Sequence, residues 1–194
     1  MRFVNREPNR LAIEALRVQP EDSVLELGFG PGYAIKTLAS LAPNGCVLGI
    51  DASPEMLVQA TRLNARAIRQ GQVKLRLGDF GHLPWPTNTI DKILAVNVAY
   101  FFSHEGRQLQ EVFRVLKPGG LLSLYATDRA TMSKWKFTGP ETHRLFDKSE
   151  LQSLLVTAGF LEEELSIRLA TLSFGVTGYV AIARKTQLKD EPNN

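Results

Sequence analysis

The chain has 194 residues, 44% of them hydrophobic and 22% charged, with a formal net charge of +3. These values fit one globular domain of ordinary size and do not by themselves indicate a nucleic-acid partner. Because Cys46 is the only cysteine, intrachain disulfides and zinc sites built from several cysteines are excluded, and we expect no metal. The start is polar and no apolar run approaches the ~20 residues of a membrane-spanning helix. We therefore expect a cytoplasmic protein without a membrane span.

Helical and strand-like patterns alternate along the chain. Apolar residues at helical spacing predict helices over residues 11–18, 34–42, 54–67, 103–116 and 148–158. Short apolar runs predict strands over residues 23–28, 46–51, 73–77, 90–96, 121–127, 165–169 and 178–183. Ser53, Ser103 and Asp147 stand where three of these helices are expected to begin.

This alternation predicts an α/β fold with a doubly wound, seven-stranded and mostly parallel sheet. The last two strands have no helix between them, so we expect them to form a C-terminal antiparallel hairpin. No internal repeat or linker interrupts the pattern. We therefore predict a single domain over residues 1–184 and a flexible tail over residues 185–194.

The turn after the first strand contains three glycines at alternate positions, Gly28, Gly30 and Gly32, within LELGFGPGY. In a doubly wound sheet this turn lies at the edge where ligands bind. Glycine permits positive φ and lets a ligand approach the backbone, which favours a ligand site. The alternative is a tight turn that only packs the helix against the strand. A dinucleotide-binding motif needs glycine where this chain has Tyr33, which disfavours a nicotinamide cofactor.

Two aspartates follow strands at the same predicted edge. Asp51 ends the second strand, where its carboxylate can accept hydrogen bonds from both hydroxyls of a ribose. Asp79 follows the third strand and can accept a hydrogen bond from the exocyclic amine of adenine. Each also has an ordinary alternative, because Asp51 can cap the turn before Ser53 and Asp79 can be a turn aspartate.

Four segments carry a resemblance to a known family: VLELGFGPG, LGIDASPEML, LRLGDFGHLPWPTNTIDKILAVNVAYFF and LKPGGLLSLYAT. In this order they resemble the successive motifs of Rossmann-like, class I S-adenosylmethionine-dependent methyltransferases, over roughly residues 9–184. The pattern is most similar to the small-molecule branch that includes the ubiquinone and menaquinone biosynthesis methyltransferases. The resemblance implies a Rossmann-like fold, S-adenosyl-L-methionine as cofactor and S-adenosyl-L-homocysteine as product.

The resemblance also implies a set of cofactor-binding residues. The amino acid part of the cofactor would be surrounded by Glu26, Gly28, Gly30 and Gly32, and bordered by Asn97. The ribose hydroxyls would be held by Asp51, with Ala52 and Met56 packing near the adenine or ribose. The adenine amino group would be bound by Asp79, while the backbone of Phe80 contacts the ring edge.

Methyl transfer from a sulfonium is an in-line displacement, so the protein mainly positions the acceptor and a general base is optional. His143 lies between the fifth strand and the Asp147 helix, where this family usually builds part of its substrate pocket. It is a weak candidate for the base, against an ordinary loop histidine. The residues that can line an acceptor pocket, with ordinary core packing as the alternative, are Tyr33, Tyr100, Phe101, Trp135 and His143.

The expected acceptor is a small molecule, methylated on oxygen, nitrogen or carbon, and we expect no nucleic acid. Residues 97–100 lack the two prolines that nucleic-acid amino-methylating enzymes carry there, and one cysteine disfavours both arsenite and 5-methylcytosine chemistry. The alternatives are a protein or RNA methyltransferase with a basic surface around Lys134, Lys136 and Arg144, or a non-catalytic cofactor-binding or regulatory subunit. Only about twenty residues precede the first strand. Either the pocket is therefore open to a large acceptor, or a homodimer partner or the loop over residues 129–146 covers it.

Overall fold

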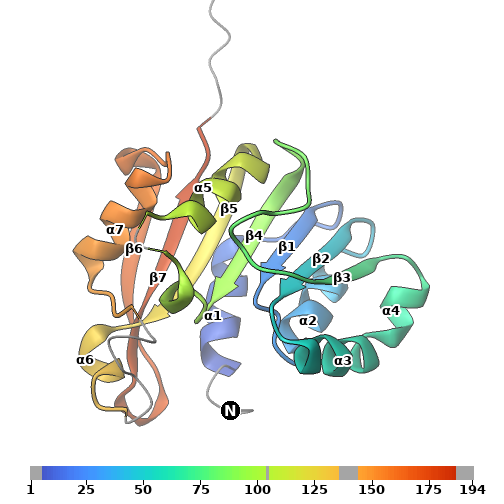
Figure 1. Ribbon diagram of the computed structural model, residues 1–194, viewed down its shortest axis with the longest axis horizontal. Helices are drawn as coiled ribbons and strands as arrows, with labels where there is room; N and C mark the ends of the chain where they lie inside the picture. Colours follow the sequence, from blue (N-terminus) through green and yellow to red (C-terminus); the bar gives the residue numbers. More distant parts are fainter. Residues whose placement is uncertain (1–5, 104, 136–143, 187–194) are drawn as a thin grey trace, which may run out of the picture.

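The computed structural model describes residues 6–103, 105–135 and 144–186, which form a seven-stranded sheet (Figure 1). The strand order is β3-β2-β1-β4-β5-β7-β6. The strands are β1 (Ser23–Leu27), β2 (Cys46–Asp51), β3 (Val73–Leu77), β4 (Ile90–Val96), β5 (Leu116–Thr127), β6 (Leu165–Thr171) and β7 (Thr177–Arg184). Pairing is parallel from β3 to β5, and β7 runs antiparallel to both β5 and β6. The predicted fold class, with its C-terminal antiparallel hairpin, is confirmed.

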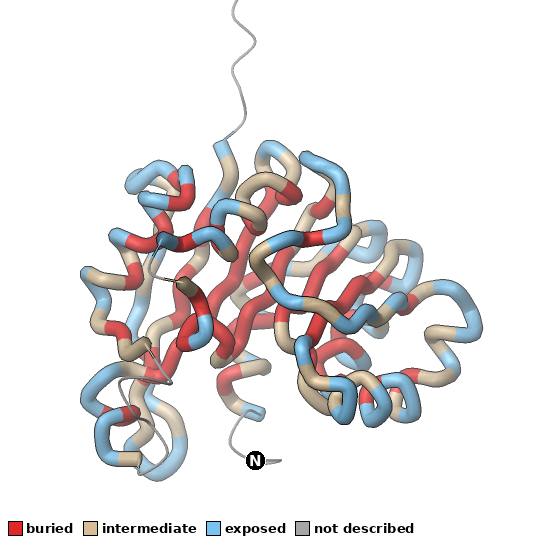
Figure 2. The backbone as a smooth tube through the Cα atoms, viewed as in Figure 1, coloured by how far each residue is buried: buried red, intermediate tan, exposed pale blue. Residues whose placement is uncertain are grey.

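Helices cover both faces of this sheet. They are α1 (Arg6–Leu16), α2 (Tyr33–Leu41), α3 (Pro54–Leu63), α4 (Ala65–Arg69), α5 (Arg107–Val115), α6 (Arg129–Met132) and α7 (Lys148–Thr157), with 3-10 turns η1 (Ala99–Phe101), η2 (Glu162–Glu164) and η3 (Ser173–Gly175). One hydrophobic cluster packs α1, α2 and α3 on one face, and another packs α5, α6 and α7 on the other. Buried residues run along the strands between these layers (Figure 2).

Two of the predicted helix caps form as the sequence indicates. The Ser53 hydroxyl accepts a hydrogen bond from the Met56 N–H at 3.3 Å, with Pro54 as the first helical residue. Asp147 and Glu150 form a reciprocal capping box at the start of α7. Both caps use a short polar side chain to satisfy backbone donors that the first helical turn leaves without partners.

The helix predicted over residues 54–67 divides at Asn64 into α3 and α4. The Asn64 side chain, only 4% exposed, donates to the carbonyl oxygens of Gly32 at 3.1 Å and Ala60 at 2.9 Å. A buried asparagine that bonds the backbone competes with the regular helical pattern, which explains the break. The same side chain joins the end of α3 to the glycine turn.

The helix predicted to start at Ser103 begins instead at Arg107. Gly106, with φ of +68°, takes the N-cap position. The side-chain oxygen of Gln108 accepts hydrogen bonds from the backbone N–H of Ser103 at 2.9 Å and from its hydroxyl at 3.0 Å. Because the Gln108 side chain binds Ser103 in this way, Ser103 lies outside the helix and α5 begins only at Arg107.

Lys185, the first residue of the predicted tail, is hydrogen-bonded to the end of α5, and residues 187–194 lie outside the described residues. The ammonium group of Lys185 donates to the carbonyl oxygens of Phe113 at 2.7 Å and Leu116 at 2.8 Å. Its backbone N–H also bonds the Gly120 carbonyl at 3.0 Å. Lys185 therefore belongs to the folded domain, where its charge meets the carbonyl groups at the end of α5.

Replacing Asn64 with alanine is expected to lower the free energy of unfolding by about 1–3 kcal/mol, since the Gly32 carbonyl loses its buried partner. Urea denaturation of the purified variant measures this loss. Gln59→Ala, at an exposed position of α3, is the matched control and should stay within about 0.5 kcal/mol of the parent chain. Equal stability of the two variants would contradict a structural role for Asn64.

Candidate active site

A cavity of about 510 Å³ opens at the carboxyl edge of the sheet. Its position is the one favoured for ligands in doubly wound sheets, because the strand order reverses between β1 and β4. The lining residues are Gly28, Asp51, Ala52, Ser53, Asp79, Phe80, Val96, Asn97, Val98, Phe101 and Gln108. They come from the ends of β1, β2 and β4, the segment after β3, η1 and α5.

The three glycines of the turn after β1 have different reasons to be glycine. A Cβ atom on Gly28 would lie 2.3 Å from Val98 Cγ1, and one on Gly32 would lie 2.7 Å from Asn64 Nδ2. A Cβ on Gly30 would meet no described atom within 4 Å. All three have positive φ, of +65°, +51° and +86° in chain order. Packing therefore explains Gly28 and Gly32, whereas a side chain at Gly30 would point into open space.

Asp51 connects the end of β2 to the glycine turn. One carboxylate oxygen accepts a hydrogen bond from the Gly30 N–H at 2.8 Å, and the other accepts from the Ser53 N–H at 2.9 Å. Asp51 therefore caps the turn before Ser53 and also lines the cavity, and its contact with a ribose stays a prediction. A carboxylate has about four acceptor positions, so these two bonds leave capacity for a pair of ligand hydroxyls.

Glu26 lies in the middle of β1, between β2 and β4, and is only 4% exposed. Burial raises the pKa of its carboxyl well above the ordinary value, the Asp51 carboxylate raises that pKa further, and a hydrogen bond from the Ile35 N–H opposes the shift. Its second carboxyl oxygen has no hydrogen-bond partner among the described residues. A cationic ligand group near this oxygen would supply the hydrogen-bond donor that the described residues do not provide.

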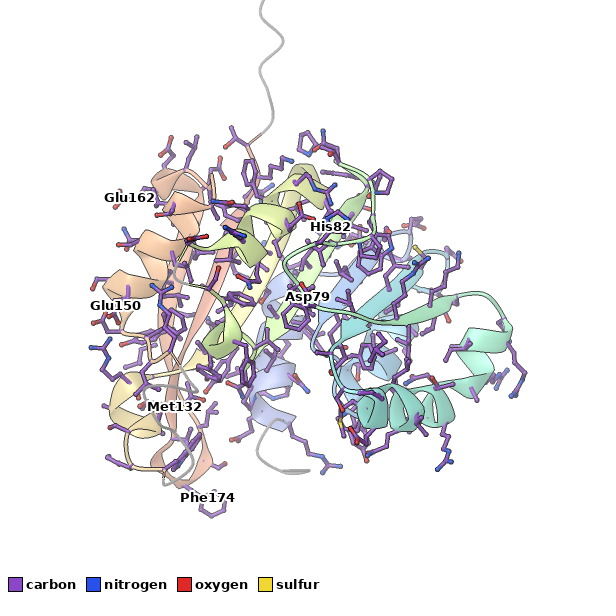
Figure 3. All side chains as sticks on the ribbon, in the orientation of Figure 1. Asp79, His82, Met132, Glu150, Glu162 and Phe174 are labelled. Atoms are coloured by element: carbon purple, nitrogen blue, oxygen red, sulfur yellow. The ribbon has the colours of Figure 1, made fainter. Side chains whose placement is uncertain are left out.

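Asp79 and Phe80 lie on the segment between β3 and β4 that passes in front of the sheet, where Figure 3 labels Asp79 and His82. One Asp79 oxygen accepts a hydrogen bond from the Gly81 N–H at 2.6 Å, as expected of a turn aspartate. Asp79 is otherwise exposed and lines the cavity. The Phe80 ring packs edge-on against Phe102, with ring centroids 6.2 Å apart.

Several predicted site residues lie outside the cavity lining. Glu26, Gly30, Gly32 and Met56 are not among the lining residues, and Met56 packs against the cluster that holds α1, α2 and α3. Tyr33 is 42% exposed at the start of α2, and Trp135 packs against the α5–α7 core. Contact of these two with an acceptor stays a prediction.

The acceptor-pocket candidates after β4 differ in exposure. Phe101 is 60% exposed and lines the cavity, so it presents an aromatic face to a ligand. Tyr100 is 6% exposed, and its hydroxyl is bound to Asn97 at 2.8 Å. His143, the weak candidate base, lies outside the described residues.

Comparison with known proteins identifies the family. A protein-family sequence model described as a methyltransferase domain matches residues 24–120. This chain is a member of that family. Its cofactor is S-adenosylmethionine. An uncharacterized methyltransferase of Bacillus subtilis, YdaC, is 28% identical over 166 residues, which cover 84% of this chain and 90% of that protein.

Two further comparisons agree with this methyltransferase assignment. A demethylmenaquinone methyltransferase of Symbiobacterium thermophilum is 35% identical over 103 residues, covering 53% of this chain but only 41% of that protein. The crystal structure of a SAM-dependent methyltransferase from Aquifex aeolicus superposes with a TM-score of 0.68 at 21% identity, over 90% of this chain and 88% of that one. The latter shows the shared fold alone.

The site fits the cofactor of this methyltransferase family on three observations. The unpartnered oxygen of Glu26 suits an ammonium group, the spare acceptor positions of Asp51 suit ribose hydroxyls, and the open space at Gly30 admits a ligand against the backbone. Within the described part of the chain, no group of three or more His, Cys, Asp or Glu side chains is placed to bind a metal ion. Over the same residues, no helix has the length and apolar character needed to cross a membrane.

Four further residues line the cavity without having been predicted as site residues: Ser53, Val96, Val98 and Gln108. Val98 fills the space beside Gly28, a contact that only the folded turn creates. Gln108 reaches the cavity because α5 begins late, and no motif marks it. Ser53 was recognised only as a helix cap, although its position two residues after Asp51 was a usable signal.

Gly32→Ala is expected to lower the free energy of unfolding by about 1–3 kcal/mol more than Gly30→Ala. Both positions have positive φ, so backbone strain is similar, but only at Gly32 does the added methyl group collide with Asn64 and with the Ala60 backbone. Thermal and urea unfolding of the two variants measure the difference. Similar losses would contradict the distinction drawn between these glycines.

Glu26→Gln tests the raised pKa of the buried carboxyl. In the unfolded chain this group titrates near its ordinary pKa of 4.5, whereas the folded protein retains the proton to a higher pH. Stability contributed by the protonated group is therefore present below that pKa and is lost as the pH rises through the folded-state pKa. The variant stays neutral, so its free energy of unfolding should rise relative to that of the parent chain as the pH increases above 4.5. Glu163→Gln, at an exposed position, is the control, and a difference that does not vary with pH would contradict the assignment.

Proposed function

We propose that this protein transfers the methyl group of S-adenosylmethionine to an oxygen, nitrogen or carbon atom of a small-molecule acceptor. The observation that carries the proposal is a cavity lined by the polar residues Asp51, Asp79 and Asn97 together with the apolar residues Val96, Val98 and Phe101. Such a lining provides apolar contact together with a few polar groups that orient a ligand. The demethylmenaquinone methyltransferase relative, named for a small-molecule acceptor, supports the same class.

In this proposal the cofactor supplies the activated methyl group, bound to a sulfonium sulfur. Glu26 pairs with the ammonium group of its amino acid part, and Gly30 lets that part approach the backbone. Asp51 accepts hydrogen bonds from the ribose hydroxyls, in addition to those it accepts from the turn. Asp79 accepts from the adenine amine, beside the backbone of Phe80, and Ala52 packs against the adenosine. The chain itself positions the acceptor and excludes water, and it needs no dedicated base.

A protein or RNA acceptor has less support. That alternative needs an open basic surface around Lys134, Lys136 and Arg144, of which Lys136 lies outside the described residues. The guanidinium of Arg144 lies over the Phe146 ring at 5.1 Å, and its backbone N–H bonds the Tyr100 carbonyl at 3.0 Å. The Arg144 guanidinium therefore packs against Phe146, which disfavours a role in binding a polyanion. A non-catalytic role is disfavoured because the acids and the open glycine of the site are intact.

Calorimetric titration with S-adenosylmethionine, S-adenosylhomocysteine and NADH, side by side, tests the cofactor part of the proposal. We expect micromolar binding of the first two ligands and none of NADH. An acceptor screen with phenols and quinone precursors then tests the acceptor class, with S-adenosylhomocysteine release as the readout. Absence of binding by both adenosyl ligands would overturn the proposal.

Asp51→Ala is expected to weaken S-adenosylhomocysteine binding by roughly 1–3 kcal/mol, the scale of hydrogen bonds lost from a charged group. Glu55→Ala removes the same charge one turn away, at an exposed position of α3, and should leave the affinity nearly unchanged. Calorimetry of both variants measures the two effects. If Asp51→Ala binds as tightly as its control, Asp51 does not hold the ribose.

A further inference from the structure

The segment that follows β3 carries two of the cavity-lining residues and is held at both ends. At its start, the Gly78 N–H donates to the Asp51 carbonyl oxygen at 3.0 Å. At its other end, Leu83 is only 1% exposed and packs in the same core as α5. Between these two points lie Asp79 and Phe80, both of which line the cavity. Their placement therefore depends on how firmly Leu83 is fixed.

Two charged residues of α5 fix Leu83 and the residues that follow it. The Glu111 carboxylate accepts a hydrogen bond from the Leu83 N–H at 2.8 Å. The Arg114 guanidinium donates to the carbonyl oxygens of Leu83 and Trp85, each at 2.9 Å. It also donates to the two oxygens of Glu111, at 2.6 Å through Nε and at 2.8 Å through Nη2. We call Glu111 and Arg114 together the α5 clamp.

The sequence of the clamped segment explains why side chains hold it. Pro84 and Pro86 have no N–H, and the residue before a proline favours an extended backbone over a helical one. The neighbouring carbonyl groups therefore need donors from another element. A guanidinium offers several N–H groups in a fixed planar fork, which a lysine ammonium cannot reproduce. Hydrogen bonds from Arg114 hold the pKa of Glu111 below its ordinary value, so the carboxylate stays an acceptor at neutral pH.

We propose that Glu111 and Arg114 are positioning residues that make the site selective for a purine with an amino group, because they hold the segment that carries Asp79. Neither residue lines the cavity, so their effect on a ligand passes through that segment. An aspartate carboxylate accepts hydrogen bonds and donates none, so it favours an amino group over a carbonyl oxygen at the same ring position. The inference rests on the proposed function, in which Asp79 accepts from the adenine amine.

Arg114→Lys tests the α5 clamp, because it keeps the positive charge and the aliphatic stem and removes the fork. The first readout is the ratio of the dissociation constants of S-inosylhomocysteine and S-adenosylhomocysteine, which differ in a carbonyl oxygen in place of the adenine amino group. The second readout is the hydrogen-exchange rate of the Leu83 amide. Glu111→Gln, whose carboxamide has a single acceptor oxygen, is the second variant. Arg10→Lys, at an exposed ion pair with Glu14 on α1, is the matched control.

We expect the parent chain and the control to prefer S-adenosylhomocysteine by roughly tenfold or more, the scale of one hydrogen bond to a charged group. In both clamp variants the preference should fall to about threefold or less, since that bond is weakened. The Leu83 amide should exchange faster in the same variants. Adding Arg114→Lys to Asp79→Ala should not lower the preference further, because the two changes act on one contact.

Three outcomes would overturn the inference. They are an unchanged preference in the clamp variants, a parent chain that does not distinguish the two ligands, and a further fall in the Asp79→Ala background. A loss of affinity by the same factor for both ligands is the first of these and would assign the clamp a structural role alone. Failure of the parent chain to bind S-adenosylhomocysteine would instead count against the proposed function, and exchange of the Leu83 amide would still report whether the clamp holds its segment.

Discussion

Parallel pairing of β1 with both β2 and β4 is the constraint on which the active site depends. The pairing brings three carboxyl strand ends to one edge, so the segments that follow β1, β2 and β4 must turn away beside one another. Helices that return over opposite faces separate at this point and leave room between the turns. The hydrogen bond from the Gly30 N–H to Asp51 then joins two of these turns directly. Without this edge, residues about 20 to 70 positions apart would not share one cavity.

Hydrogen-bonded polar groups beside the cavity hold the segments that form its lining. Asn64 holds the glycine turn from one side, and the hydrogen bonds that join Thr127, Tyr100 and Asn97 hold the end of β4 from the other. Each of these groups is costly to bury unless it is bonded, so the bonds leave few alternative arrangements. One Glu26 oxygen differs, because it has no partner among the described residues, and the Tyr125 hydroxyl is the other such buried atom. Of these two groups, the Glu26 carboxyl is the one at the strand that leads into the glycine turn.

The acceptor side of the site is less determined by the fold than the cofactor side. Sites grafted on a shared scaffold vary mainly through their loops, and a family resemblance alone does not identify the molecule bound there. Phe101 and Gln108 enter the cavity from η1 and α5, elements with no motif of their own. Their chemistry, an aromatic face beside a carboxamide, agrees with an acceptor that is partly apolar and carries a polar group.

The sequence by itself determined the succession of strands and helices along the chain, the edge of the sheet at which the cavity lies, and the polar residues at strand ends such as Asp51 and Asp79. These follow from local patterns: apolar periodicity, capping residues and glycines in a turn. Only the tertiary structure decided that packing requires glycine at positions 28 and 32, whereas Gly30 borders open space. The side chains that an added Cβ would meet belong to Val98 and Asn64, which lie far along the chain. Tyr100, likewise, was an aromatic residue with two equally reasonable interpretations until β5 placed the Thr127 N–H against its hydroxyl. Contacts between residues distant in sequence depend on how strands register and helices pack, and no local pattern encodes that geometry.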